Sequence, residues 1–233
     1  METPRELARA MDAGLDPIEV YGLEEVLSDE PAVERAVAGG AEPIAVTSAV
    51  LQKLSYRENP RGFVAVMQAK ARGLSDLAME ADACVIVCSG LEKPGNLGAI
   101  LRSADALGAG AVLIDRPDYD LYNPNALRAS TGAVFTVPVV GDHTDALIAW
   151  LKDNGFKVCA ATPDAEVAVG AVDVTGRIAW VLGSEAEGLG GEWLEAADTA
   201  VTIPMRGQTT DSLNVSVSAA LLLYETDRQR RGV

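Results

Sequence analysis

The chain has 233 residues, and 34 acidic against 19 basic side chains give it a net charge of −15. This length predicts one domain or two small ones, and a hydrophobic fraction of 48 % excludes a disordered chain. No run of about 18 apolar residues occurs, so we expect no transmembrane helix, and the charged first six residues do not resemble a signal peptide. Three cysteines in apolar surroundings cannot form a disulfide framework, which predicts a reducing, cytoplasmic setting.

The charge is unevenly distributed along the chain. Residues 53–72 contain five basic residues and one acid, Glu58, a local charge of five minus one, or +4, whereas residues 1–30 are strongly acidic. The overall acidic balance argues against a nucleic-acid partner, because phosphate binding needs a basic surface. The basic stretch keeps that partner open, with a solvated charged face as the alternative.

Residues 1–76 carry short, mixed elements. Helices are predicted over residues 6–13, 30–39 and 48–55, and strands over residues 17–21, 43–46 and 63–67. A turn at Asn59-Pro-Arg-Gly62 leads into the last of these strands, and residues 75–83 are expected to link to a second unit.

From residue 83 onward, apolar strands alternate with helical segments. Strands are predicted over residues 84–88, 111–114, 134–140, 157–161, 178–182 and 200–203. Helices are predicted over residues 96–107, 124–130, 144–154, 191–196 and 213–230. This alternation predicts an α/β fold with a mostly parallel sheet that is covered on both faces.

Ligands of such sheets bind beyond the carboxyl ends of the strands, and three unusual segments lie there. The first, residues 90–104, offers a helix N-terminus with Asn96 near the cap and Arg102 about two turns later. A helix N-terminus attracts anions, and an arginine can grip a phosphate in a fork geometry. The alternative is a capped amphipathic helix with an arginine on its surface.

The other two segments follow later strands. In residues 183–189, Gly183 permits close approach of the backbone to a ligand, and Glu185 can accept a hydrogen bond from a substrate. Residues 204–225 form a polar loop that enters a helix whose first turn carries Ser212 and Asn214. An acidic surface turn and ordinary helix capping are the alternatives for these two segments.

Several other classes of site lack their sequence signature. His143 is the only histidine, so neither a zinc site nor a Ser-His-Asp hydrolase is expected. The glycines at positions 90, 95 and 98 do not form the dinucleotide fingerprint, and a P-loop is missing from the sequence. We therefore expect no metal, and a generic nucleotide-binding enzyme is disfavoured.

The three segments, in this order, resemble motifs 1, 2 and 3 of the SpoU (TrmH) family of RNA ribose 2′-O-methyltransferases, in the SPOUT superfamily. The matching stretches are residues 96–102 (NLGAILR), residues 181–189 (VLGSEAEGL), and residues 203–207 (IPMRG) with residues 212–217 (SLNVSV). Residues 1–76 resemble the small L30e-like RNA-binding domain of this family, followed by a linker at 77–82 and the methyltransferase domain at 83–233.

The resemblance implies a C-terminal trefoil knot, S-adenosylmethionine as cosubstrate, and a homodimer. It implies cofactor contacts from Thr162, Leu182, Gly183, Ile203, Met205 and Leu213. It implies catalytic or substrate-holding roles for Asn96, Arg102, Glu185, Ser212 and Asn214. The resemblance also implies a role for Arg102 as the base, but because an arginine stays protonated we interpret Arg102 as a phosphate clamp. Lys53, Arg57 and Arg61 are the expected RNA contacts.

Two departures from the family pattern stand out. The loop from Ile203 to Leu213 is one residue longer than the usual pattern. The chain also begins inside what resembles the first helix of the small domain, so we expect a domain shortened at its N-terminus. Ribosomal RNA is the expected substrate, with no membrane partner. The alternatives are a transfer RNA ribose methyltransferase and a non-catalytic SPOUT protein that binds RNA.

Overall fold

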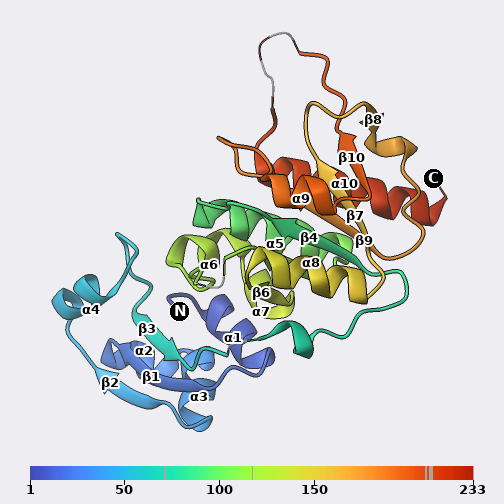
Figure 1. Ribbon diagram of the computed structural model, residues 1–233. Helices are drawn as coiled ribbons and strands as arrows, with labels where there is room; N and C mark the ends of the chain where they lie inside the picture. Colours follow the sequence, from blue (N-terminus) through green and yellow to red (C-terminus); the bar gives the residue numbers. More distant parts are fainter. Residues whose placement is uncertain (71, 117, 208, 210–211, 233) are drawn as a thin grey trace. The chain divides into compact units, whose positions relative to one another are not determined.

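The computed structural model describes residues 1–70, 72–116, 118–207, 209 and 212–232 (Figure 1). The chain divides into two compact units, Met1–Ala71 and Arg72–Val233. The sequence places the linker slightly later, at residues 77–82, and those domain bounds stay a prediction.

The small unit is built on one mixed sheet. In its described residues, β1 (Pro17–Gly22) pairs in parallel with β2 (Glu42–Ala45) and antiparallel to β3 (Phe63–Met67). Its helices are α1 (Pro4–Asp12), α2 (Glu24–Asp29), α3 (Pro31–Ala38) and α4 (Ser48–Leu54). Leu7, Val20 and Phe63 are fully buried between the helices and the sheet. The sequence patterns predict these strands and three of the helices, but not α2.

The expectation that the chain begins inside a helix is wrong. The first helix, α1, begins at Pro4, and the Thr3 side chain caps it by accepting the Glu6 N–H at 3.2 Å. A proline at the first helical position suits this start, because its missing N–H would have no partner in the helix. Met1 instead pairs with Ala65 of β3 through backbone hydrogen bonds in both directions.

The large unit is an α/β layer structure. Among its described residues a seven-stranded sheet runs in the order β6-β5-β4-β9-β7-β10-β8, and all of its neighbouring strands are parallel. The strands are β4 (Cys84–Cys88), β5 (Ala111–Ile114), β6 (Val139–Gly141), β7 (Lys157–Ala161), β8 (Val167–Ala168), β9 (Ile178–Leu182) and β10 (Thr199–Thr202). The α-helices are α5 (Pro94–Leu107), α6 (Pro124–Ser130), α7 (Ala133–Thr136), α8 (Thr144–Asp153), α9 (Gly191–Ala196) and α10 (Val215–Arg231). Two 3-10 turns, η1 (Leu74–Asp76) and η2 (Val169–Ala171), complete the unit.

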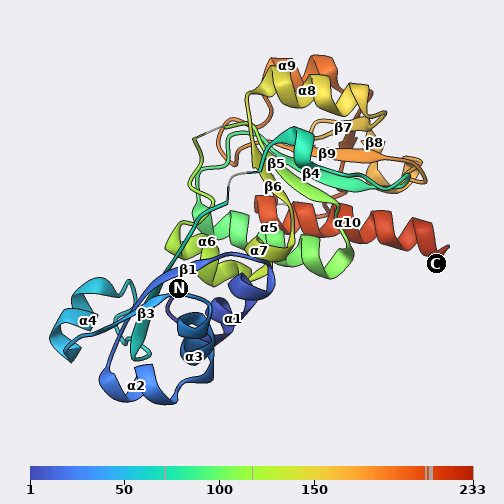
Figure 2. The ribbon, with the colours of Figure 1, turned by 90° about the horizontal axis from the view of Figure 1, so that it is seen from below.

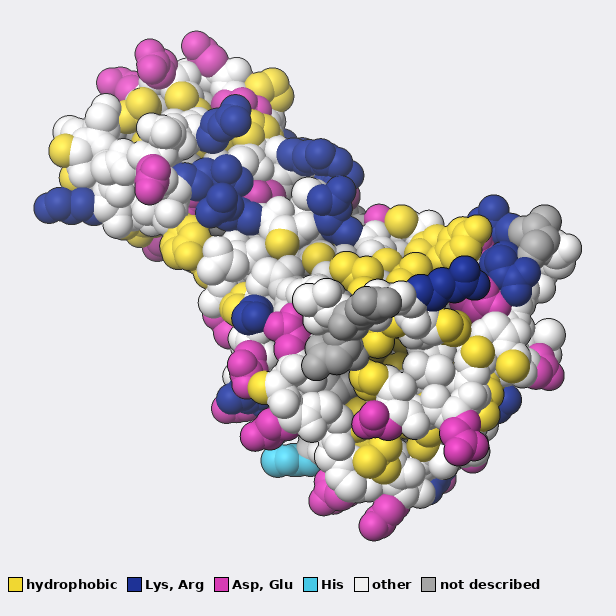
Figure 3. Space-filling view, turned by 90° about the horizontal axis from the view of Figure 1, so that it is seen from above, with side chains coloured by type: hydrophobic (Ala, Val, Ile, Leu, Met, Phe, Trp, Pro, Cys, Tyr) yellow, Lys and Arg dark blue, Asp and Glu magenta, His cyan; other side chains and the backbone are white. Residues whose placement is uncertain are grey.

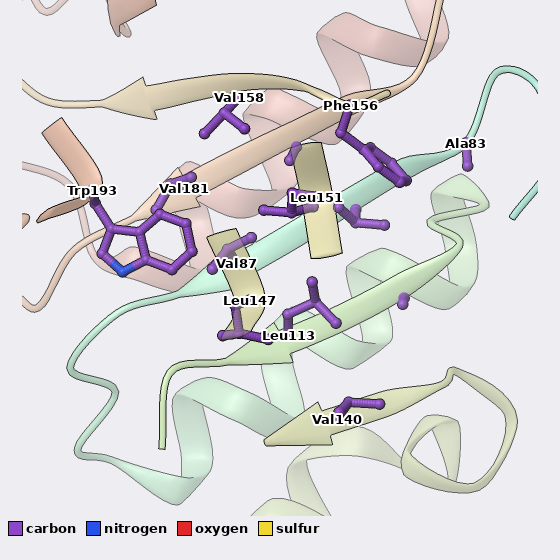
Figure 4. Close-up of a cluster of buried hydrophobic side chains, with 13 residues drawn as sticks. Ala83, Val87, Leu113, Val140, Leu147, Leu151, Phe156, Val158, Val181 and Trp193 are labelled. Atoms are coloured by element: carbon purple, nitrogen blue, oxygen red, sulfur yellow. The ribbon is translucent and has the colours of Figure 1, made fainter. Parts of the chain in front are cut away.

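Helices cover both faces of this sheet, as the apolar strands predict. Figure 2 shows α8 and α9 on one face, and α5 and α10 on the other. Leu147 and Leu151 of α8 and Trp193 of α9 pack on the first face (Figure 4). On the second face, the Trp180 indole N–H donates to Thr226 Oγ1 of α10 at 2.9 Å. None of the described helices has the length and apolar character needed to span a membrane.

The predicted strand over residues 134–140 is wrong in its first half. Residues Ala133–Thr136 form α7, and only Val139–Gly141 form the strand β6. Thr131 and Gly132 both have positive φ, 52° and 98°, which redirects the chain just before α7. Pro138 then ends the helix, because the residue before a proline avoids helical geometry. A short apolar run does not by itself distinguish a buried helical turn from a strand.

Candidate active site

The carboxyl ends of the central strands gather the candidate residues at one edge of the sheet. Strand β9 lies between β4 and β7, and β10 lies next to β7, all in parallel. The loops that follow these strands therefore leave from the same edge. Each of the three resembling motifs follows one of them, as the sequence predicts.

Glu185 is the centre of a hydrogen-bonded cluster at this edge. Its Oε1 accepts from the side-chain amides of Asn96 at 3.2 Å and Asn214 at 2.7 Å. Its Oε2 accepts from the Lys93 ammonium at 2.6 Å. Asn214 also donates to Asn96 Oδ1 at 3.2 Å. Three segments that are distant in sequence are thereby joined through one carboxylate.

This cluster keeps Glu185 ionised. The hydrogen bond from Lys93 is the largest cause that lowers the pKa of Glu185, and the Asn96 amide, the Lys93 charge and the Val215 backbone N–H lower it further. The same contact raises the pKa of Lys93. Asn214 is the N-cap of α10, and its side chain accepts the Ser216 N–H at 2.9 Å. The start of a helix stabilises an adjacent anion, which suits the ionised carboxylate.

A cleft lies beside the cluster. In the described residues an apolar pocket of about 60 Å³ is lined by Leu182, Ile203, Met205 and Leu213, among others. An adjoining open hollow of about 360 Å³ extends over Gly183 and Glu185. The predicted cofactor positions Thr162, Leu182, Gly183, Ile203, Met205 and Leu213 all line one or both of these spaces. The volume of the hollow, about 360 Å³, is within the range of sites for small organic molecules.

Gly183 has no room for a side chain. A Cβ at this position would lie 2.2 Å from the carbonyl carbon of Gly188, closer than any real contact. The backbones of Ser184 and Gly188 exchange hydrogen bonds of 3.0 and 3.1 Å, and Gly188 has a φ of 69°. The glycines thus close residues 184–188 into a tight loop, which aims Glu185 at Asn96 and Asn214.

Arg102 and Ser212 lie outside the hydrogen bonds of the cluster. Arg102 is exposed on α5, about 9 Å along the helix axis from Asn96, and bonds to none of the described residues. Ser212 lines the cleft next to Leu213. Asn96 lies in the first turn of α5, whose N-cap is Lys93, and Asn214 stands just before the first turn of α10.

The expected RNA contacts belong to the small unit. Lys53 and Arg61 are exposed there. Arg57 is partly buried, and its guanidinium faces the carboxylates of Glu2 at 3.6 Å and Glu6 at 3.3 Å. Its role as an RNA contact stays a prediction, and its observed partners are acidic side chains of its own unit.

Two residues of the edge were missed by sequence reasoning. Lys93 immediately precedes α5, and Asp164 follows β7 on the rim of the cleft. The available signal was a charged residue a few positions after an apolar strand, and it does not indicate which residue is the partner. Within the described part of the chain, no group of His, Cys, Asp or Glu side chains could hold a metal ion.

Comparison with known families identifies the class of protein. Residues 83–224 match the SpoU rRNA Methylase family, and residues 1–65 match the MRM3-like substrate binding domain. The first match spans more than half of the chain, so the chain belongs to the SpoU rRNA methylase family. This agrees with the resemblance of the three motifs.

Curated relatives cover both units. The chain is 32 % identical over 227 residues to the 23S rRNA (adenosine(1067)-2′-O)-methyltransferase of Streptomyces laurentii. The aligned region covers 96 % of this chain and 83 % of the relative. It is 34 % identical over 206 residues to the 23S rRNA (guanosine-2′-O-)-methyltransferase RlmB of Coxiella burnetii, with 85 % and 81 % covered.

Solved structures show the same fold. An RNA 2′-O ribose methyltransferase superposes with a TM-score of 0.83 at 43 % identity, over 100 % of this chain and 88 % of that one. The SpoU methyltransferase AviRb of Streptomyces viridochromogenes, solved in complex with the cofactor AdoMet, superposes with a TM-score of 0.90 at 27 % identity, over 99 % and 89 %.

Proposed function

We propose that this protein transfers a methyl group from S-adenosylmethionine to a ribose 2′-hydroxyl of ribosomal RNA. The observation that carries the proposal is the cluster of Asn96, Glu185 and Asn214 at the rim of a cleft that the expected cofactor positions line. Membership of the SpoU family and the likeness to 23S rRNA methyltransferases support the substrate class. We also infer a cytoplasmic location, which suits a ribosomal substrate and three buried, unbridged cysteines.

The cleft fits the proposed cofactor. Leu182, Ile203 and Leu213 supply an apolar wall for a planar base, and Thr162 and Asp164 add polar groups at the rim. Gly183 lines the hollow, and because it has no side chain the loop after β9 can close at Gly188 beside it. When bound, S-adenosylmethionine supplies a methyl group that its sulfonium has already activated, so the protein must position the acceptor hydroxyl.

The hydrogen-bonding capacity of the cluster supports a role for each of its members. Both amide hydrogens of Asn214 are used, on Glu185 and on Asn96. Glu185 accepts from Lys93, Asn96, Asn214 and the Val215 backbone N–H, and four donors occupy a carboxylate as an acceptor. Asn96 retains one amide hydrogen and part of its carbonyl capacity. We assign Asn96 to the ribose, with Glu185 and Asn214 as positioning residues that orient it.

Arg102 is assigned to the RNA phosphate. It is exposed on the same helix as Asn96 and has no partner among the described side chains. Its guanidinium group is therefore available to bind an anion through two hydrogen bonds. Holding the phosphate next to the target ribose would orient the hydroxyl toward the cleft. Ser212, on the rim between the cofactor positions and Asn214, is placed to contact either substrate.

We further propose a homodimer and a knotted C-terminal segment. Helix α10 exposes Val217, Leu221 and Tyr224, with 46 %, 40 % and 56 % of their surface accessible. Their spacing places them on one face of the helix, which a second copy would cover. The knot is supported by the strand order, in which β9 lies between β4 and β7 while α10 returns to pack against α5 and β9.

Transfer of labelled methyl groups tests the proposed function. Purified protein is incubated with labelled S-adenosylmethionine and separate pools of ribosomal and transfer RNA, with Arg102→Ala as the control variant. We expect label in ribosomal RNA that is lost with the variant and that maps to ribose after digestion to nucleosides. Label confined to transfer RNA would contradict the substrate class, and cofactor binding without transfer to either pool would indicate a non-catalytic RNA-binding protein.

A further inference from the structure

We propose that Tyr56 stacks on an unpaired base of the RNA substrate, and that Glu2 and Arg57 hold the loop that presents it. This site lies in the small unit, in the loop between α4 and β3, and it rests on the proposed function only for the identity of the RNA. Tyr56 is not among the RNA contacts that the sequence predicts, which are Lys53, Arg57 and Arg61.

Tyr56 is an exposed aromatic side chain in a basic segment. It has 52 % of its surface accessible, and Leu54, two residues before it, is also exposed. Lys53 and Arg61 flank it in the sequence, are exposed, and form no ion pair with any described residue. Figure 3 shows Lys and Arg side chains gathered over a face of this unit. An aromatic ring among exposed cations is the arrangement that binds single-stranded nucleic acids.

The loop that carries Tyr56 is held by one carboxylate. Glu2 accepts hydrogen bonds from the backbone N–H of Tyr56 at 2.6 Å and of Arg57 at 3.2 Å, and from Ser55 Oγ at 2.9 Å. The Gln52 side chain donates to the Glu58 carbonyl at 2.8 Å, which holds the loop from the other side. A fixed backbone reduces the entropy that an exposed side chain loses on binding.

Arg57 holds Glu2 rather than extending into solvent. Its side chain is 24 % exposed and lies 3.6 Å from Glu2 and 3.3 Å from Glu6. The backbone pairing of Met1 with Ala65 fixes the residue before Glu2 against β3. Arg57 is therefore a positioning residue, and the cations that remain for phosphates in this segment are Lys53 and Arg61.

The flanking cations favour RNA over a protein partner for this surface. Stacking requires an accessible base face, which paired nucleotides in a helix do not offer, so the ligand is an unpaired nucleotide in a loop or bulge. Because every base has such a face, Tyr56 is expected to supply affinity with little base preference.

Binding of protein-free ribosomal RNA tests the proposal. We expect Tyr56→Ala to weaken binding about 5- to 150-fold, the range for loss of one stacked base, with no change in its salt dependence. Tyr56→Phe and Tyr56→Trp should bind like the parent, and the new indole in Tyr56→Trp should be quenched by RNA. Ile18→Ala, which shortens an exposed apolar side chain of the same unit, is the matched control and should have no effect.

The cations and the positioning pair give separate readouts. Lys53→Ala and Arg61→Ala should each weaken binding and reduce the salt dependence by about one counterion. Glu2→Ala and Arg57→Ala, made in the Tyr56→Trp background, should reduce the quenching of that indole by RNA while the melting of the whole chain is monitored. Lost RNA binding with unchanged quenching in the residual complex would contradict the positioning role.

Unchanged affinity of Tyr56→Ala for protein-free RNA would overturn the proposal. If this variant bound only intact ribosomal subunits more weakly, the proposal would also be overturned, because that result indicates a protein contact.

The readouts also separate this site from the proposed function. Loss of RNA affinity with Tyr56→Ala in a protein that transfers no methyl group would sustain the stacking site and refute the enzyme. Full methyl transfer by Tyr56→Ala with an unchanged KM for RNA would sustain the enzyme and refute the stacking site.

Discussion

The Asn214 side-chain amide donates a 2.7 Å hydrogen bond to Oε1 of Glu185, and the same Asn214 caps the helix α10. One residue thus serves both the stability of the last helix and the geometry of the site. These two roles can be separated by substitution.

Asn214→Ser is expected to retain the N-cap of α10 and to lose the hydrogen bonds that organise the site. Serine is a good N-cap residue, whereas its short hydroxyl cannot replace both amide hydrogen bonds, to Asn96 and to Glu185. We expect unfolding free energy close to that of the parent and a kcat lower by about 10- to 100-fold. Asn214→Ala should lose activity and about 1 kcal/mol of stability as well. Thermal unfolding and methyl transfer, measured on both variants, would refute the assignment if Asn214→Ser remained fully active.

Arg102→Lys distinguishes a phosphate clamp from a simple positive charge. The lysine keeps the charge and loses the planar fork that binds two phosphate oxygens. We expect kcat/KM for RNA to fall by at least about tenfold, and the unfolding free energy to change by less than about 0.5 kcal/mol because the side chain is exposed. Steady-state kinetics at saturating cofactor measure the effect, and near-normal turnover would show that a bidentate clamp is the wrong role.

Gly183→Ala is expected to abolish cofactor binding. Its Cβ would lie 2.2 Å from the Gly188 carbonyl carbon, so the loop after β9 must move. Gly191→Ala is a matched control in α9, where a Cβ meets no atom within 4 Å. Calorimetric titration with S-adenosylmethionine should show no binding for the first variant and parental binding for the second. Equal binding by both variants would remove Gly183 from the proposed cofactor site.

Lys93→Met is expected to shift the acidic limb of the pH–activity profile. The Lys93 contact lowers the pKa of Glu185, so the ionised carboxylate and its stabilising contribution are present above the unfolded pKa of about 4.3 and are lost as pH falls through the lower folded value. Without the ammonium the folded pKa of Glu185 rises, and the acidic limb of kcat/KM should move to higher pH. Lys93→Arg keeps the charge and should leave the limb near its parental position; identical profiles for Lys93→Met and the parent would contradict the coupling.

The cysteines are expected to be unreactive in the folded protein. Burial raises the pKa of Cys84 and of Cys88 to about 12 and that of Cys159 to about 11. Because the thiolate is the reactive form, a thiol reagent at about pH 8 should modify none of them until the chain is unfolded, when all three should react. Rapid labelling of any of the three in the native protein would show that its strand is accessible.

Much of the architecture could be predicted from local pattern. The continuous apolar runs 84–88, 111–114, 157–161 and 178–182 coincide with β4, β5, β7 and β9, because a strand buried on both faces must be apolar along its whole length. The strand prediction for residues 134–140 was wrong in its first half for the same reason. Helix α7 is also buried and apolar, and apolar content alone does not distinguish the periodicity of a helix from that of a strand. The helix α2 was missed between two stronger signals.

The sequence itself determined the residue types of the site and the strands that they follow. It places a glycine and a glutamate after β9 and asparagines at the starts of α5 and α10, and it contains a separate basic segment near residue 57. Their pairings were decided only by the tertiary structure. Lys93 meets Glu185 across 92 positions, and Arg57 meets Glu6 across 51. Such contacts follow from a strand order that is not the chain order and from the packing of whole layers. Local periodicity carries no information about either, so only the folded chain shows which charge each arginine or lysine faces.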